Sequence, residues 1–310
     1  AQVASNRRGE NALLELAETF GAGVVCDFME RLKAHAGSII SSILEGWPLQ
    51  EGRAVARLDD GAEIHLKAAF SDGTLLLDFA GTSERHEGNF NATPAIVQSA
   101  VIYALRLLIR EKIPLNEGLL QGVDIRLPRC FLNPDFDLPA AQAPAVVAGN
   151  VETSQRIVEV LLEALQIAAG SQGTMNNFVF GNAHCSYYET ICGGTGAGNG
   201  FAGCDAVHSH MTNTAITDPE IFEKRYPVRL EQFAIREGSS GAGEWQGGAG
   251  VIRRIRFLDT LEVSLITGHR DKGPFGLAGG EPGQPGAQLY FAANCISDSP
   301  FAPLDAKASQ

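Results

Sequence analysis

The densest group of potentially reactive side chains lies in residues 187–214, which read YYETICGGTGAGNGFAGCDAVHSHMTNT. The segment combines many glycines with the carboxylate of Glu189, the imidazoles of His208 and His210, and the amide of Asn213. Glycine lets the backbone bend sharply and approach a ligand closely, and histidine titrates near neutral pH. Because ordinary packing needs no such combination, we take this segment as the first candidate for a functional site.

One residue separates His208 from His210. If this run is extended, both imidazoles face the same side, because side chains alternate along a strand. That geometry suits a proton-transfer pair or a metal, but a catalytic metal normally has about three protein ligands. Glu189, Asp205 and His184 could each supply the third, and the spacing selects none of them. Whether a metal binds stays open, and two ordinary buried or exposed histidines are the alternative.

The glycines between Cys192 and Cys204 include a formal GxGxxG match at residues 198–203. A dinucleotide-binding fold needs a helix that starts on this motif, and residues 205–214 have no helical stripe of apolar side chains. A loop that wraps a ligand or a partner chain, or a plain structural turn, remains. In the first of these, Gly194 and Gly196 bring the backbone next to a substrate.

A second polar segment contains Asn89 and Asn91 and ends at Pro94, where the pattern predicts the start of a helix. The free N–H groups and the dipole of a helix N-terminus attract anions and polar oxygens. Asn89 and Asn91 are therefore candidates for binding the polar groups of a substrate. Ordinary capping of the helix by Asn91 or Thr93 is the alternative interpretation.

The elements that position these residues follow from the apolar spacing. Spacing of three to four predicts helices at 11–20, 25–46, 94–108, 151–169 and a short one after Asp218. Alternation predicts strands at 64–70, 75–79, 123–127, 178–180, 186–191, 228–235, 251–257, 261–267 and 288–291. Ser71-Asp72-Gly73 predicts a hairpin with a three-residue turn and positive φ at Gly73. Because helices gather early and strands late, we expect an α+β fold, with a helical N-terminal part and a hairpin, then a mostly antiparallel β region with Gly-rich loops.

Composition limits the class of protein. The chain has 310 residues, 45% of them apolar, and a net charge of −12. We expect a subdomain of helices and a β-hairpin at 1–150, an α+β region with the glycine-rich site at 151–295, and a flexible tail at 296–310. No run of Lys and Arg suggests nucleic acid, and no apolar run is long enough for a membrane span. Six scattered cysteines without CxxC fit a reducing cytoplasm.

Several motifs occur in one order: SNRRGEN, DFAGTS, GNFNAT, the 187–214 segment, and SSGAGEWQGGAGVIR. In this order they resemble the hydantoinase B/oxoprolinase family. The resemblance implies the B-type component of an ATP-dependent enzyme that opens a cyclic amide, a hydantoin or 5-oxoproline. ATP is then expected on a partner, the hydantoinase A-type ATPase subunit, which agrees with the lack of a GxxxxGK[ST] motif here. The implied chemistry is phosphorylation of a carbonyl oxygen, followed by attack on the activated carbon, in a multi-subunit oligomer.

The resemblance covers only the later part of the family protein. The GGTHxxD-like motif and the His-His pair of its front part, which hold a divalent metal in carboxylase members, do not occur in this sequence. The opening, AQVASNRRGE, also reads as a piece of something longer, so we expect the chain to be inactive alone.

His208, His210, Glu189 and Asn213 all lie in the signature stretch of the resemblance, which itself assigns them no role. For opening a cyclic amide, we expect His208 or His210 to do acid/base work and Glu189 to orient them. A subunit of an ATP-dependent ketone carboxylase and a non-catalytic assembly module are the alternatives.

Overall fold

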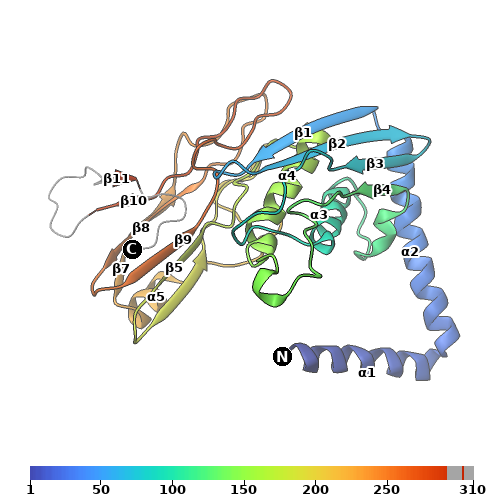
Figure 1. The fold of residues 1–310 in the computed structure, drawn as a ribbon, viewed down its shortest axis with the longest axis horizontal. Coiled ribbons are helices and arrows are strands. Elements are labelled where there is room, and N and C mark those ends of the chain that lie inside the picture. The colour runs from blue at the N-terminus through green and yellow to red at the C-terminus, as the bar shows by residue number, and fades with distance from the viewer. Residues whose placement is uncertain (292–301, 304–310) are drawn as a thin grey trace.

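The computed structural model describes residues 1–291 and the short strand at 302–303. Residues 292–301 and 304–310 lie outside it, and with them most of the tail predicted at 296–310. Two helices pack under one sheet in the first part of the fold, and the second half adds smaller antiparallel sheets beside it (Figure 1). The predicted α+β fold, helical first and mostly antiparallel later, is confirmed. None of the helices in the described ranges is long and apolar enough to cross a membrane.

The two predicted N-terminal helices form an arm that projects from the body (Figure 1). They are α1 (Gln2–Phe20) and α2 (Ala22–Glu45), which meet at Gly21, whose φ is +87°. Helix α1 buries no residue, and α2 buries only positions in its second half, such as Ile40 and Leu44. The prediction of one half-buried helix therefore holds for the second half of α2 and is wrong for the first.

The first sheet covers two helices. Its strands are β1 (Glu51–Arg57), β2 (Glu63–Ser71), β3 (Thr74–Asp78) and β4 (Val123–Arg126), in that order, with β4 parallel to β3 and the other pairs antiparallel. Beneath them lie α3 (Pro94–Leu107) and α4 (Ser154–Ala164). Alternate residues of β2, Ile64, Leu66 and Ala68, are buried in one core with these helices, as the period of two predicts. Short helical turns lie at Glu117–Leu120, Ala140–Gln142 and Gly149–Thr153.

The turn between β2 and β3 differs from the prediction. Ser71 pairs directly with Thr74, so the loop has two residues, Asp72 and Gly73. Both have positive φ, 50° and 73°. Two left-handed residues match the right-handed twist of the flanking strands, and Asp-Gly is a preferred pair for this turn. The predicted three-residue turn is therefore wrong, although the hairpin and the positive φ at Gly73 are confirmed.

The second half is built around an aromatic core. Its elements are β5 (Asn177–Gly181), β6 (Ser186–Thr190), α5 (Pro219–Arg225), β7 (Val228–Ile235), β8 (Val251–Phe257), β9 (Glu262–Ile266), β10 (Leu289–Tyr290) and β11 (Ala302–Pro303). Strands β6, β5 and β9 form one antiparallel sheet, while β7 pairs with β8 and β10 with β11. Phe180, Tyr187 and Phe222 pack between the sheet and the β7–β8 hairpin. This core fixes the hairpin, and with it the glycine-rich turn at 236–250, relative to β5 and β6.

Candidate functional site

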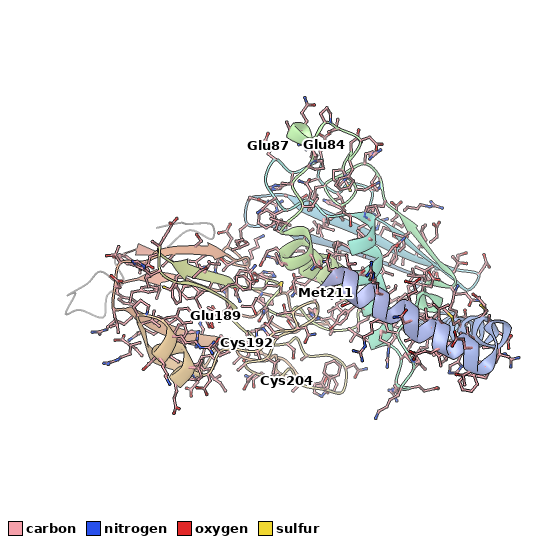
Figure 2. All side chains as sticks on the ribbon, turned by 90° about the horizontal axis from the view of Figure 1, so that it is seen from below. Glu84, Glu87, Glu189, Cys192, Cys204 and Met211 are labelled. Atoms are coloured by element: carbon pink, nitrogen blue, oxygen red, sulfur yellow. The ribbon has the colours of Figure 1, made fainter. Side chains whose placement is uncertain are left out.

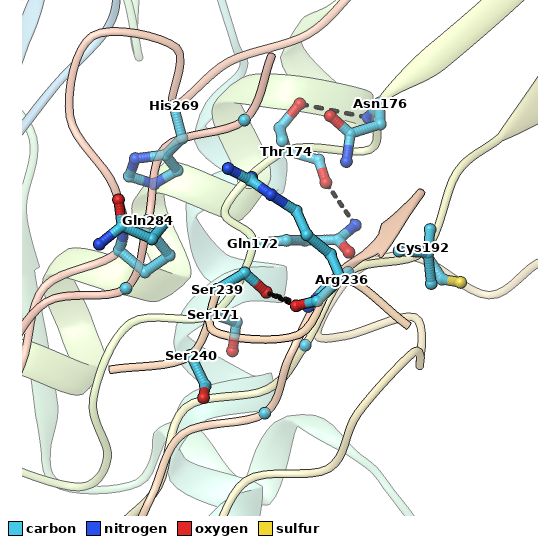
Figure 3. A pocket seen from close by; sticks show the side chains of 18 of the residues that line it. Ser171, Gln172, Thr174, Asn176, Cys192, Arg236, Ser239, Ser240, His269 and Gln284 are labelled. Atoms are coloured by element: carbon cyan, nitrogen blue, oxygen red, sulfur yellow. Dashed lines mark hydrogen bonds between the residues drawn. The ribbon is translucent and has the colours of Figure 1, made fainter. Parts of the chain in front are cut away.

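A cavity of about 1720 Å³ lies in the second half of the protein (Figure 3). Four loops enclose most of it, and they contain residues 169–176, 191–199, 236–250 and 267–288. Polar side chains from these loops, among them Ser171, Gln172, Arg236 and His269, line the cavity. Such a concave site with a few convergent polar groups is the usual place for a small-molecule ligand.

Glycines let the loops around the cavity pack backbone against backbone. A Cβ on Gly194 would lie 2.1 Å from Gly248 O, and one on Gly196 would lie 1.9 Å from Ala169 O. The amide of Gly196 donates to Ser171 Oγ at 3.1 Å. Both Gly194 and Gly196 line the cavity, and their contact with a substrate stays a prediction. No helix follows the GxGxxG match at 198–203, which agrees with rejecting a dinucleotide fold.

Replacing Gly196 by alanine should therefore lower the free energy of unfolding by about 2–3 kcal/mol, because the methyl group must displace the backbone of Ala169. Gly200 in the same loop is the matched control. It has φ of +88°, and a methyl group at this position would have no neighbouring atom within 4 Å, so Gly200→Ala should cost only about 1 kcal/mol for the left-handed backbone. Urea unfolding of both variants measures the difference, and equal losses would contradict the packing described.

The two histidines do not form the predicted pair. Residues 208–210 are not a strand, and His210 has a φ of 55°, so the alternation that would put both rings on one face is absent. His210 Nδ1 is hydrogen-bonded to Tyr103 Oη of α3 at 3.2 Å. His208 Nε2 instead lies 3.4 Å from Thr214 Oγ1. The prediction of a shared face is wrong, and neither ring is among the residues that line the cavity.

Burial favours the neutral form of both imidazoles. It lowers the pKa of His210 to about 4, against the opposing charge of Glu159. Burial also lowers the pKa of His208, against the charge of Glu189. Within the described residues, His208 Nδ1 and His210 Nε2 are buried and have no hydrogen-bond partner. Each ring therefore has one nitrogen without a partner and favours its neutral form, and its predicted acid/base role stays a prediction.

Glu189 is committed to other partners. Its Oε1 accepts from Arg253 Nε at 2.5 Å, and its Oε2 accepts from Arg253 Nη2 at 3.0 Å and from Tyr187 Oη at 2.7 Å. The Arg253 guanidinium also lies over the rings of Phe222 and Phe233, at 5.2 Å and 5.3 Å from their centroids. Glu189 thus joins β6 to β8 and influences His208 through its charge, not through the orienting hydrogen bond that we expected.

The asparagine segment lies away from this region. The side chain of Asn91 is buried, accepts from the His86 amide at 2.8 Å and donates to three carbonyls, those of His86, Gly88 and Ala145. It holds its own loop together and has no free group to offer a substrate. The loop projects at one edge, where Glu84 and Glu87 lie far from Glu189 and Cys192 (Figure 2). Asn89 is half-buried and Asn213 exposed, and neither lines the cavity.

A buried charge network at the cavity was missed from the sequence. His269 Nδ1 donates to Lys272 O at 2.8 Å, and its Nε2 lies 3.0 Å from Glu159 Oε2. Arg156 donates to the same carboxylate oxygen at 3.1 Å. Burial would raise the pKa of Glu159, but the charges of His269 and Arg156 outweigh it and lower the pKa to about 2. Glu159 stands in the apolar run IVEVLLEA, and a carboxylate at a core position of a helix is the signal that could have found it.

A second acidic residue of the same segment behaves in the opposite way. Burial raises the pKa of Glu152 to about 7, although Thr174 Oγ1 and the amide of Met175 donate to its Oε1 at 2.9 Å and 3.0 Å. Asn176 and His269, which line the cavity, both have left-handed backbones, with φ of 49° and 56°. Strained non-glycine residues gather at functional sites more often than elsewhere.

Within the described ranges, no three His, Cys, Asp or Glu side chains are grouped to hold a metal.

Known proteins resemble the chain over nearly its whole length. The sequence is 43% identical over 308 residues to 5-oxoprolinase 1 of Arabidopsis thaliana, covering 94% of this chain and 24% of that protein. The fold is similar to the crystal structure of an ATP-dependent caprolactamase from Pseudomonas jessenii, with a TM-score of 0.77, 20% identity, and coverage of 100% of this chain and 55% of that one. It is also similar to a nucleotide-free acetone carboxylase, with a TM-score of 0.75, 18% identity, and coverage of 89% of this chain and 41% of that one.

The chain thus spans about a quarter of the length of the curated 5-oxoprolinase and about half of the caprolactamase chain. Residues 1–309 match the family described as Hydantoinase B/oxoprolinase. The motif order, the mixed fold and the 5-oxoprolinase relative agree with this match. The chain belongs to the hydantoinase B/oxoprolinase family.

Proposed function

We propose that this chain is the B-type component of an ATP-dependent enzyme that opens a cyclic amide such as 5-oxoproline or a hydantoin. The observation that carries the proposal is the 43% identity to a 5-oxoprolinase across 94% of the chain. The large cavity between the glycine-rich loops supports it, since a small lactam needs a concave site that backbone groups can approach. A cytoplasmic complex with a hydantoinase A-type ATPase subunit completes the proposal.

In this proposal, ATP on the partner supplies the phosphoryl group that activates the amide oxygen. Gly194 and Gly196 bring main chain close to the ring. Water then attacks the activated carbon while a neutral imidazole, His208 or His210, takes a proton from it. The C–N bond breaks as the ring nitrogen takes a proton, and a second water hydrolyses the resulting acyl phosphate to the open-chain carboxylate and inorganic phosphate. Both imidazoles favour the unprotonated form at pH 7, so each is free to accept a proton, although a pKa of about 4 makes His210 a weak base.

The test is amide-dependent release of ADP by the chain together with its A-type partner. If one imidazole is the base, His208→Ala or His210→Ala should lower that rate about 100-fold. His184→Ala is the matched control, because His184 is exposed at the turn between β5 and β6. Circular dichroism checks that each variant is folded. If both variants retain the full rate, the histidine roles are wrong. If the chain is needed only for the complex to form, it is an assembly module.

A second function has one observation in its favour. The fold is also shared with an acetone carboxylase, at a TM-score of 0.75. A ketone carboxylase subunit would give ADP release that needs bicarbonate and a ketone, and a divalent metal in the longer protein. An amide-dependent rate that is unchanged without bicarbonate decides for the lactam, and a bicarbonate requirement decides for the carboxylase.

A further inference from the structure

The cavity is lined by several guanidinium groups, and two of them are paired with carboxylates. Five arginines line it: Arg236, Arg253, Arg254, Arg256 and Arg270. Arg253 is paired with Glu189 and Arg256 with Glu231, each at 2.5 Å. The exposed Arg254 lies over the ring of Phe291. In the part of the chain that the structure describes, Arg236 and Arg270 form no ion pair with a carboxylate.

Arg270 is held by neutral acceptors. Its Nε donates to Gln288 Oε1 at 2.8 Å, its Nη1 to Gly268 O at 2.5 Å, and its Nη2 to Asn176 Oδ1 at 2.9 Å. Burial lowers the pKa of Arg270 to about 10, and the charges of Asp59 and Glu152 oppose this effect. A guanidinium has five N–H donors, so these three bonds fix its plane and leave donors over.

Arg236 enters the same corner from the opposite loop. Its Nη1 donates to Pro285 O at 2.8 Å, and its side chain extends from the loop of Ser239 in the direction of His269 (Figure 3). The next residue, Gly286, touches the other guanidinium, because a Cβ there would lie 2.1 Å from Arg270 Nη1. The two guanidiniums therefore contact the same dipeptide, and the charge of Arg236 helps to lower the pKa of Arg270.

Arg236 and Arg270 are like charges in a half-buried corner. The charges of Asp59 and Glu152 also act on Arg270, and Asp59 accepts from its backbone amide, but within the described residues neither carboxylate forms an ion pair with its guanidinium. An anion that bonds to both guanidiniums would therefore be stabilised there. We propose that Arg236 and Arg270 form an anion subsite of the cavity, which binds the carboxylate of a carboxylated lactam. This inference rests on the proposed function. Planar guanidinium groups bind carboxylate or phosphoryl oxygens with paired, charge-assisted hydrogen bonds, so a phosphoryl group is the other source of the same chemistry.

The subsite predicts how the chain separates two similar lactams. 5-Oxoproline and 2-pyrrolidinone share the same ring, and only the first has a carboxylate. Arg236→Gln removes one guanidinium group, with its charge and its paired N–H donors, and should weaken binding of 5-oxoproline about tenfold or more. Binding of 2-pyrrolidinone should not change, which also shows that the cavity is still folded. Arg236→Lys keeps the charge but loses the paired N–H donors, so it should give an intermediate loss.

The experiment is titration calorimetry of the whole chain with 5-oxoproline, 2-pyrrolidinone and inorganic phosphate. Arg254→Gln is the matched control, because it removes a guanidinium that lines the same cavity outside the corner. Arg270→Gln is the second test variant, with its thermal stability measured because Arg270 also holds the loop at 268–288. Tighter binding of 5-oxoproline than of 2-pyrrolidinone, lost in Arg236→Gln and kept in Arg254→Gln, supports the subsite.

The other outcomes separate the two proposals. If both lactams bind equally, before and after Arg236→Gln, the subsite is overturned and lactam binding stands. If neither lactam binds but phosphate does, and Arg236→Gln abolishes it, the subsite stands as a phosphoryl site and the lactam proposal for this chain fails. If no ligand binds the chain, both are overturned.

Discussion

Replacing Arg253 by leucine should lower the free energy of unfolding by about 4 kcal/mol, the usual cost of leaving a buried charge without its partner. Glu189 is only 5% exposed, and the guanidinium supplies two of the three hydrogen bonds of its carboxylate. Without Arg253, only the hydroxyl of Tyr187 remains to stabilise the charge. The ion pair also joins β6 to β8, so its loss should loosen the cavity wall.

The same strand offers the matched control. Arg256 on β8 forms an ion pair with Glu231 at 2.5 Å, but its side chain is 65% exposed. Exposed ion pairs contribute about 0–1 kcal/mol, so Arg256→Leu should leave stability nearly unchanged. Urea unfolding of both variants measures the two losses at one pH and salt concentration. Similar losses would mean that burial does not set the strength of the Glu189 pair.

A double variant tests the mechanism of that loss. Arg253→Leu combined with Glu189→Leu removes both charges, and replacing a buried ion pair by apolar side chains is often neutral or stabilising. The double variant should therefore be more stable than Arg253→Leu alone. If it is less stable, lost packing against Phe222 and Phe233 explains the single variant better than an unpaired charge does.

Local patterns predicted the regular elements well. The strand alternation in β2 and β3, and the Asp218-Pro219 start of α5, depend on neighbours in the sequence, and the structure confirms them. An Asp followed by Pro predicts a capped helix start from the sequence alone. The structure shows this cap, because the Asp218 carboxylate accepts from the amides of Glu220 and Ile221. The α+β class followed from the order of these elements.

The site was harder, because its contacts join distant residues. His269 meets Glu159 across 110 positions, and nothing near His269 in the sequence marks it as the partner of a buried carboxylate. Gly196 packs on the backbone oxygen of Ala169, which lies in a distant loop. Such a contact leaves no periodic pattern of apolar residues in the sequence. The prediction that His208 and His210 share a face assumed an extended backbone. His210 instead has a left-handed backbone, and the spacing of apolar residues gives no information about such a single-residue conformation.

The second large effect is a pair of opposite pH profiles. The pKa of His210 is lowered by burial from 6.5 to about 4, so between these values the unfolded chain binds more protons. His210 therefore destabilises the fold as pH falls from about 6.5 to about 4, by about 3 kcal/mol in total. The pKa of Glu152 is raised by burial from 4.5 to about 7, so the folded chain binds more protons there. Glu152 destabilises the fold as pH rises through this window, by a similar amount.

In the wild-type chain the two effects oppose each other between about pH 4.5 and 6.5, and two variants should separate them. Glu152→Gln leaves the histidine effect, to which His208 adds in the same direction, so its stability should fall as pH falls. His210→Gln leaves the Glu152 effect, so its stability should fall as pH rises. Urea midpoints at fixed ionic strength from pH 4.5 to 7 measure both slopes. Slopes of the same sign would show that burial does not hold these two groups in their neutral forms, and the neutral imidazole that the proposed chemistry needs would lose its physical basis.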